Sequence, residues 1–225
     1  CRWGAVVFLR RPSNLMAAAN GIGETHTQFF TVATADKPFV FDGGGSLTDA
    51  VIAYETYGTL NAKKDNAVLV FHALSGSQHA AGFTADVPRT DGRWTVDCQQ
   101  GWWDAYIGPG KAVDTDRYFV ICANWLGGCY GSTGPASINP ATGRPYGNSF
   151  PSVRTSDVVR SQALLLDGLG IKKLHAVIGS SVGGFSSMLS QYDILRTQGY
   201  RKMNVFAIPM IMGNGAAGHV AIRFK

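Results

Sequence analysis

The chain has 225 residues, of which 45% are hydrophobic and 16% are charged, a composition typical of a globular protein and not of a disordered one. Its net charge of +5 comes from scattered basic residues without a nucleic-acid-binding motif, and no stretch of about 18 or more apolar residues predicts a membrane span. The four cysteines show neither a C-x-x-C pair nor metal-ligand spacing, which indicates cytosolic thiols. Composition therefore predicts a cytoplasmic globular protein and excludes nucleic-acid, membrane and metal-binding classes.

Apolar segments predict several β-strands in the first part of the chain. Residues 51–57 mix apolar and polar side chains, which favours an antiparallel strand near the edge of a sheet. Residues 67–71 and 118–123 are uninterrupted apolar runs of strand length. Such runs are typical of strands that are covered on both faces.

Residues 156–167 predict a helix that ends at Gly168 and Gly170. One face of this helix has the spacing expected for packing on a sheet, and it carries Val158, Val159, Gln162, Leu165 and Leu166. Thr155 or Ser156 is expected to cap its first turn.

A strand over residues 174–178 is predicted after the helix, and residues 203–208 are expected to form the next strand before Pro209. Strands that alternate with helices place the chain in the α/β class, with a mostly parallel sheet and flanking helices.

The strand over residues 174–178 runs directly into Gly179-Ser180-Ser181-Val182-Gly183, which has the spacing Gly-x-Ser-x-Gly. This spacing is typical of a nucleophile elbow, a strained strand-to-helix turn that exposes a serine above a sheet. The turn needs small residues on both sides of the serine, because side chains there would collide with the strand or the helix. An ordinary glycine-rich turn with an accidental serine is the alternative for the pentapeptide alone. We expect Ser181 to be a catalytic nucleophile.

The segment from His72 to Gly76 follows the strand over residues 67–71, where proteins with such an elbow place a loop that completes an oxyanion hole. Leu74 is the expected backbone N–H donor in this loop, and Val182, next to the nucleophile, is the expected second donor. Two such amides stabilise the alkoxide of an acyl-transfer intermediate.

The other polar features near these loops have simpler interpretations. His72 precedes the nucleophile in the chain, so we expect it to orient its loop through a hydrogen bond and not to act in catalysis. His79 is expected to be a loop residue. The glycine-rich segment 127–134 lacks the Gly-Lys-Ser/Thr ending of a phosphate-binding loop, and it is expected to form a wall of the active site.

Longer blocks of sequence carry a more specific resemblance. They are His72 to Gly76, Gly101 to Asp104, Ile107 to Ala112, Asp114 to Cys122, Asn124, Leu126 to Pro135 and Pro145 to Gly147. With these blocks the chain resembles the homoserine O-acetyltransferase family. The resemblance implies an α/β-hydrolase fold and an enzyme that moves an acetyl group from acetyl-CoA to the hydroxyl of homoserine, an early step toward methionine. It also implies that Ser181 carries the acyl group.

The resemblance divides the chain into an N-terminal extension, residues 1–39, which is expected to be partly disordered, and a partial α/β-hydrolase domain, residues 40–225. The family continues well beyond the end of this chain, so later strands of the sheet are expected to be missing. After Ser181 the only acid is Asp193 and the only histidine is His219. Neither is expected to complete a catalytic triad, so the activity of this chain is expected to be impaired.

Several alternatives remain open. A serine esterase or thioesterase would use the same residues, and the chain could also be an inactive fragment. The sequence does not decide between an acetyl and a succinyl donor, or between homoserine and serine as acceptor. No bound cofactor is expected, acetyl-CoA being a co-substrate, and the resemblance implies a homodimer where the full-length fold is present.

Overall fold

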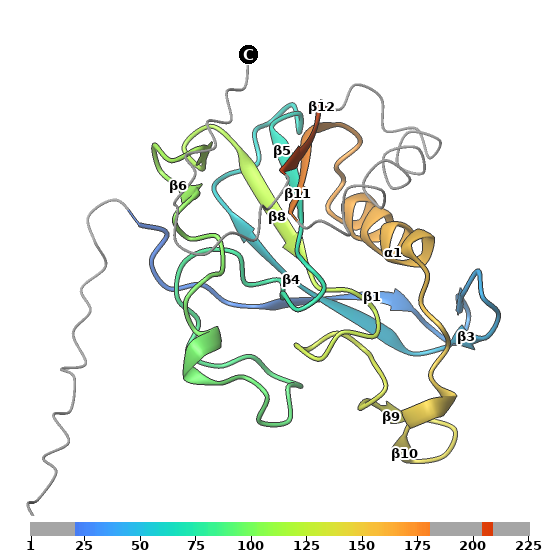
Figure 1. The fold of residues 1–225 in the computed structure, drawn as a ribbon. Helices are drawn as coiled ribbons and strands as arrows, with labels where there is room; N and C mark the ends of the chain where they lie inside the picture. The colour runs from blue at the N-terminus through green and yellow to red at the C-terminus, as the bar shows by residue number, and fades with distance from the viewer. Residues whose placement is uncertain (1–20, 181–203, 209–225) are drawn as a thin grey trace, which may run out of the picture.

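The computed structural model describes residues 21–180 and 204–208. Its centre is a six-stranded sheet in the order β1-β4-β8-β5-β11-β12 (Figure 1). These strands are β1 (Gln28–Ala33), β4 (Ala50–Tyr57), β5 (Ala67–Phe71), β8 (Phe119–Ala123), β11 (Leu174–Ser180) and β12 (Asn204–Ile208). β8, β5, β11 and β12 are parallel, whereas β4 is antiparallel to both β1 and β8. The predicted α/β class, the mostly parallel sheet and the antiparallel strand near its edge are confirmed.

Short elements lie around the outside of this sheet (Figure 1). Three two-stranded ribbons are formed by β2 (Phe39–Val40) with β3 (Ser46–Leu47), β6 (Ile107–Gly108) with β7 (Val113–Asp114), and β9 (Ile138–Asn139) with β10 (Arg144–Pro145). The short 3₁₀-helices are η1 (Val96–Cys98) and η2 (Gly147–Ser149).

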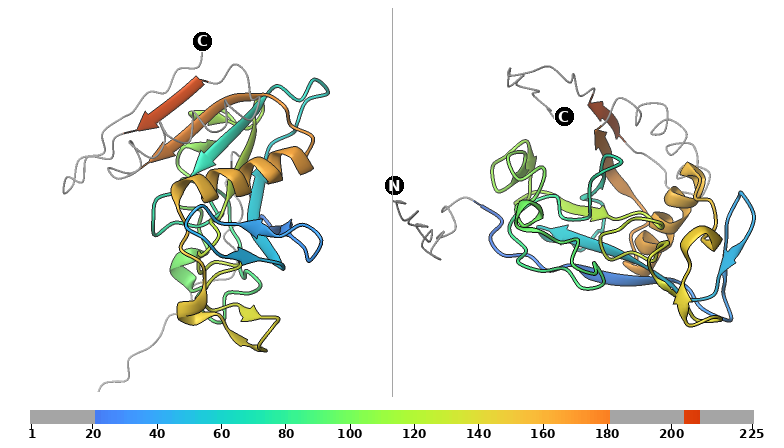
Figure 2. Two further views of the ribbon diagram at one scale, coloured as in Figure 1. Left: turned by 90° about the vertical axis from the view of Figure 1, so that its right-hand side faces the viewer. Right: turned by 60° about the horizontal axis from the view of Figure 1, so that its bottom comes forward.

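One face of the sheet is covered by helix α1 (Thr155–Gly168), which lies across the strands in Figure 2. The side chains that the sequence placed on its inner face are all buried, namely Val158, Val159, Gln162, Leu165 and Leu166. The apolar ones share a core with Ile52, Leu69 and Ile121 of the sheet. Burying each side chain of this size contributes about 1.5–3 kcal/mol, so this face accounts for much of the stability of the domain.

The start of α1 differs from the prediction. Neither Thr155 nor Ser156 caps the helix, because Arg154 is the N-cap residue. Asp157 closes the first turn by accepting the Arg154 N–H at 2.8 Å, and it also accepts the Asp42 N–H at 3.0 Å. A carboxylate in the first turn is also favoured by the helix dipole. The prediction was wrong because a long-range partner, Asp42, contributes to this helix end.

The opposite face of the sheet is covered, over the residues that the structure describes, mainly by loops. Val70 and Cys122 point to this side and form a second core with Ala81 and Trp103. Leu69 belongs to the first core, and both Leu69 and Val70 are fully buried. Successive residues of β5 are therefore buried on opposite faces, as the uninterrupted apolar run predicted.

The two edge strands of the sheet in the described part of the chain are β1 and β12. β1 lies inside residues 1–39, the segment assigned to an N-terminal extension, and it pairs with β4. Residues 1–20 lie outside the described part. β12 confirms the strand expected over residues 203–208, and it extends the sheet beside β11. No helix in the described ranges is long and apolar enough to cross a membrane.

Candidate active site

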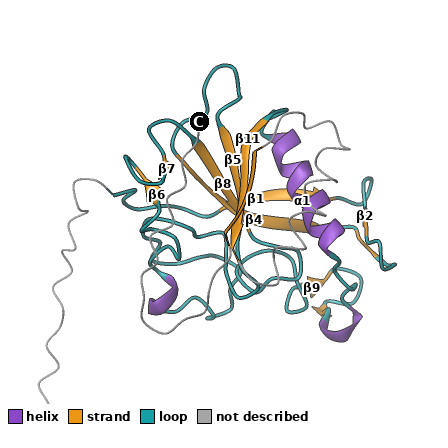
Figure 3. Cartoon of the chain, turned by 45° about the horizontal axis from the view of Figure 1, so that its top comes forward, coloured by secondary structure: helices purple, strands orange, loops and turns teal. Residues whose placement is uncertain are grey.

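The carboxyl ends of β8, β5 and β11 lie side by side (Figure 3). Phe71, the last residue of β5, pairs with Gly179, so β11 ends one residue later at Ser180, just past the end of β5. The predicted nucleophile Ser181 and its neighbour Val182 come next in the chain, and both lie outside the described residues. Ligands of open α/β sheets bind outside the carboxyl ends of the strands, so this edge is the candidate site.

The loop from His72 to Gly76 begins where β5 ends. His72 is buried, its ring stacks on Trp125, and its Nδ1 lies 2.7 Å from the Ala73 carbonyl oxygen. Burial lowers the pKa of His72 to about 4, although the Ala73 carbonyl and the Asn124 side chain act in the opposite direction. The imidazole is therefore neutral near pH 7, and its Nδ1–H donates to the carbonyl. This is the loop-orienting role that the sequence predicted.

Leu74 lies at the tip of this loop, and the residue is 86% exposed. The loop turns tightly because the Gly76 N–H donates to the Ala73 carbonyl at 2.8 Å. A Cβ atom on Gly76 would lie only 2.8 Å from the His72 Cβ, so the turn requires glycine. No described residue accepts a hydrogen bond from the Leu74 N–H. Its role as an oxyanion donor stays a prediction, because its expected partner Val182 is not described.

The residue after β8 is Asn124, which is buried and shapes the next loop. Its Nδ2 donates to the Tyr130 carbonyl at 3.0 Å, and its Oδ1 accepts the Trp125 N–H at 2.9 Å. The glycine-rich segment 127–134 is also fixed to β4, because Ser132 Oγ accepts the Ala53 N–H at 2.9 Å. This segment lies beside the end of β8, and its role as a wall of the site stays a prediction.

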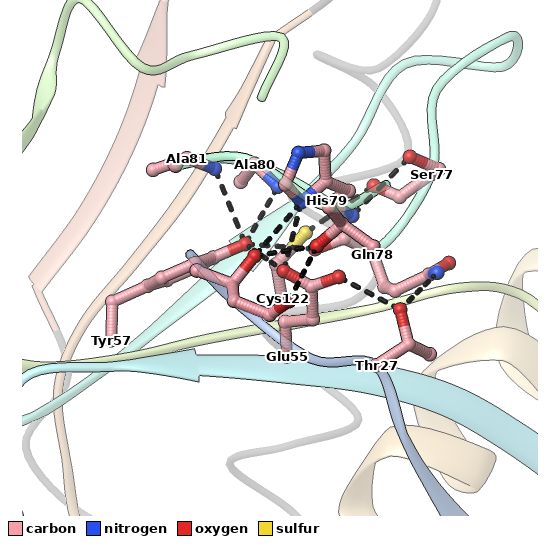
Figure 4. A network of polar contacts seen from close by, with 12 residues as sticks. Thr27, Glu55, Tyr57, Ser77, Gln78, His79, Ala80, Ala81 and Cys122 are labelled. Atoms are coloured by element: carbon pink, nitrogen blue, oxygen red, sulfur yellow. Dashed lines mark hydrogen bonds and ion pairs between the residues drawn. The ribbon is translucent and has the colours of Figure 1, made fainter. Parts of the chain in front are cut away.

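A buried polar cluster lies under the segment that follows the loop (Figure 4). Glu55 and Tyr57 point from β4 toward His79, and all three are at most 2% exposed. Glu55 Oε2 accepts the Tyr57 hydroxyl at 3.0 Å and lies 2.9 Å from His79 Nδ1. His79 Nε2 lies 3.0 Å from the Gln99 carbonyl oxygen, so it donates there. Burial, and then the Glu55 charge, raises the pKa of Tyr57 well above its usual value, which keeps the phenol protonated.

His79 lies in the segment between β5 and η1, so the expectation that it is a loop residue is confirmed, but its place in a buried polar cluster was not predicted. The available signal was Glu55, a carboxylate in a strand segment that is otherwise mostly apolar, with Tyr57 on the same face two residues later. The partner residue His79 follows 24 positions after Glu55, and only the folded chain brings the two together.

The remaining candidates are placed as follows. Asp193 and His219 lie outside the described residues, so the structure does not relate them to Ser181. Across residues 21–180 and 204–208, no group of histidine, cysteine, aspartate or glutamate side chains is arranged to hold a metal ion.

Comparison with known proteins gives consistent results. A homoserine O-acetyltransferase of Solidesulfovibrio magneticus is 49% identical over 183 residues, covering 80% of this chain and 44% of that protein. A homoserine O-succinyltransferase of Alkalilimnicola ehrlichii is 50% identical over 177 residues, covering 79% of this chain and 42% of that protein. The crystal structure of esterase E22 superposes with a TM-score of 0.60 at 42% identity, over 71% of this chain and 42% of that one.

The chain thus spans less than half the length of these relatives. The resemblance to homoserine O-acetyltransferases is confirmed at the level of sequence similarity. A model of the alpha/beta hydrolase fold matches residues 66–189, which include β5, β8, α1, β11 and the Gly-x-Ser-x-Gly segment. The chain belongs to the alpha/beta hydrolase fold family.

Proposed function

We propose that the chain carries the nucleophile of a homoserine O-acetyltransferase. The observation that supports this proposal is the end of β11, where Gly179 and Ser180 begin the Gly-x-Ser-x-Gly segment and Gly179 pairs with Phe71, directly before the loop His72–Gly76, in a chain 49% identical to a homoserine O-acetyltransferase. The proposed substrates are acetyl-CoA and homoserine, with no resident cofactor, and the proposed compartment is the cytoplasm.

The proposed reaction has two steps at Ser181. In the first, Oγ attacks the thioester carbonyl carbon of acetyl-CoA, the C–S bond breaks, and coenzyme A leaves with the serine proton as a thiol. In the second, the homoserine hydroxyl oxygen attacks the acetyl-serine, the bond to Ser181 breaks, and the homoserine proton restores the serine. Both steps pass through an alkoxide that needs hydrogen-bond donors.

Leu74 and Val182 are the proposed donors to this alkoxide. The Leu74 N–H makes no hydrogen bond to the described residues, and the neutral His72 imidazole fixes the loop that carries it. Removing one donor of this kind typically lowers the rate by about 10²–10³.

Turnover by this chain is proposed to be slow. Both steps need a base and an acid, and after Ser181 the sequence offers only Asp193 and His219. Enzymes of this logic that lack triad members retain about 10³–10⁴ over water, from oxyanion stabilisation and binding alone.

A serine esterase is the second candidate, because the chain is similar to esterase E22 over most of its length. The two functions differ in whether homoserine or water accepts the acyl group, and exclusion of water decides between them.

Thiol release from acetyl-CoA and from succinyl-CoA would test these proposals, measured with homoserine, with serine and with neither acceptor. Release that requires homoserine supports acyl transfer, and the preferred thioester identifies the donor. Release of similar rate without an acceptor supports the esterase. A Ser181→Ala variant should lose either activity, whereas an unchanged rate in that variant would contradict both functions.

A further inference from the structure

We propose that Tyr57 is a positioning residue whose hydroxyl fixes the segment Ser77–Ala81, and through it the loop His72–Gly76 that presents the Leu74 N–H. This inference rests on the proposed acyl-transfer function. It assigns a role to a buried tyrosine on β4 that is neither the proposed nucleophile nor one of the proposed oxyanion donors.

The Tyr57 hydroxyl both accepts and donates hydrogen bonds. Its oxygen accepts the Ala80 N–H at 2.7 Å and the Ala81 N–H at 3.2 Å (Figure 4). Its own proton has the Glu55 carboxylate at 3.0 Å and the Gln78 carbonyl at 3.3 Å as acceptors. The charged and closer acceptor is the stronger one, so the phenol donates to Glu55. One hydroxyl thus fixes two consecutive amides of the segment Ser77–Ala81.

The Glu55 carboxylate holds the Tyr57 hydroxyl in this orientation. Its Oε1 accepts the Thr27 hydroxyl at 2.8 Å, and its Oε2 has Tyr57 at 3.0 Å and His79 Nδ1 at 2.9 Å. Removing one partner of a buried charged side chain destabilises the folded protein. The intact cluster, however, adds little stability compared with well-packed apolar side chains at the same positions. The cluster therefore contributes mainly by requiring one arrangement of its members, and Tyr57 is the member that contacts the segment Ser77–Ala81.

Other contacts show that Ser77–Ala81 is a fixed base for the loop. Trp102 Nε1 donates to the Ser77 carbonyl at 3.0 Å, and the Trp103 N–H donates to the Ala80 carbonyl at 2.8 Å. The loop His72–Gly76 connects this base to the end of β5. A shift of the segment Ser77–Ala81 therefore displaces Leu74 relative to the carboxyl ends of the parallel strands. A displacement of about 1 Å in a site of this kind lowers a rate by up to about 10²-fold.

Tyr57→Phe tests this role, because it removes only the hydroxyl. Tyr54→Phe is the matched control: Tyr54 lies on the same strand, packs in the other core, and donates to Gln28 Oε1 at 3.0 Å. The probe is p-nitrophenyl acetate, whose acetyl group forms an ester with Ser181 Oγ while p-nitrophenolate leaves and the serine proton passes to solvent.

We expect the limiting acylation rate of Tyr57→Phe to fall about 10-fold to 10²-fold, with little change in the ester concentration for half-maximal rate. Tyr54→Phe should acylate like the parent chain. A rate for Tyr57→Phe within twofold of the parent chain, in folded protein, would overturn the proposal. This probe needs no homoserine. The effect of Tyr57→Phe on the acylation rate can therefore be measured even if the chain does not acetylate homoserine.

Amide hydrogen exchange supplies a readout that needs no catalysis. The Gly76 N–H is bonded to the Ala73 carbonyl at 2.8 Å, so its exchange reports whether the loop keeps its shape. We expect exchange at Gly76 to rise about tenfold in Tyr57→Phe and to stay unchanged in Tyr54→Phe. Unchanged exchange at Gly76 in Tyr57→Phe would show that the hydroxyl does not position the loop.

Discussion

The imidazole of His72 stacks on the indole of Trp125, with ring centroids 4.7 Å apart and planes inclined by 21°. The two residues follow β5 and β8, so the contact joins the loops at the carboxyl ends of neighbouring parallel strands. It also excludes water from the His72 ring. The loop that carries the proposed Leu74 donor is thereby tied to the loop that follows β8.

The buried His72 should make stability depend on pH. Its pKa is about 4 in the folded chain and near 6.5 when exposed, so the unfolded chain binds more protons between these values. Stability is then complete above pH 6.5 and is lost as the pH falls toward 4. The loss from pH 7 to pH 5 should be about 2 kcal/mol for this group.

Urea unfolding at pH 7 and pH 5 measures this loss, with His72→Asn as the variant that cannot titrate. The expected loss is about 2 kcal/mol smaller in His72→Asn than in the parent chain. His26→Asn, at an exposed position, is the control for the exchange of a histidine for an asparagine. Burial also lowers the pKa of His175, which adds a loss of the same sign to every protein compared. Equal losses in the parent and His72→Asn would rule out a neutral buried imidazole.

The His79–Glu55 pair should be sensitive to removal of one partner. His79→Leu leaves the buried Glu55 carboxylate without its ring partner, and the expected loss of unfolding free energy is about 3–5 kcal/mol. Asp91→Asn is the matched control, because it breaks an ion pair with Arg93 whose members are 66% and 44% exposed. That variant should change stability by less than about 1 kcal/mol. Similar melting temperatures for the two variants would contradict the structural importance of the cluster.

Gly101 should tolerate no larger residue. A Cβ atom there would lie 2.3 Å from the Ala81 Cα, a backbone contact that cannot be relieved by a side-chain rotation. Gly101→Ala should therefore cost about 1–3 kcal/mol or more and disturb the segment Ser77–Ala81. Gly110→Ala is a comparison with open space around the Cβ, where only the φ of +67° is unfavourable. Thermal melts of both variants measure the difference, and an equal or smaller effect at Gly101 would count against the packing described here.

Local patterns were sufficient to predict most of the sheet and its helix. The uninterrupted apolar run 67–71 predicted a strand buried on both faces, and the spacing of the apolar residues in α1 predicted which face of the helix is buried. Asp157 and His79 could not be interpreted in this way, because their partners Asp42 and Glu55 are distant in sequence. The same holds for the stacking of His72 on Trp125. Motif spacing located the carboxyl edge as the candidate site, whereas the buried contacts that shape it depend on tertiary structure.

The mass of the peptide containing Ser181, measured after incubation with acetyl-CoA and again after addition of homoserine, shows whether this serine carries the acyl group. We expect an acetyl group on Ser181 that disappears with formation of O-acetylhomoserine, slowly in this chain, and no adduct in Ser181→Ala. Acetylhomoserine formed at the same rate by Ser181→Ala, or an acetyl-serine that homoserine does not discharge faster than water, would contradict acyl transfer through Ser181.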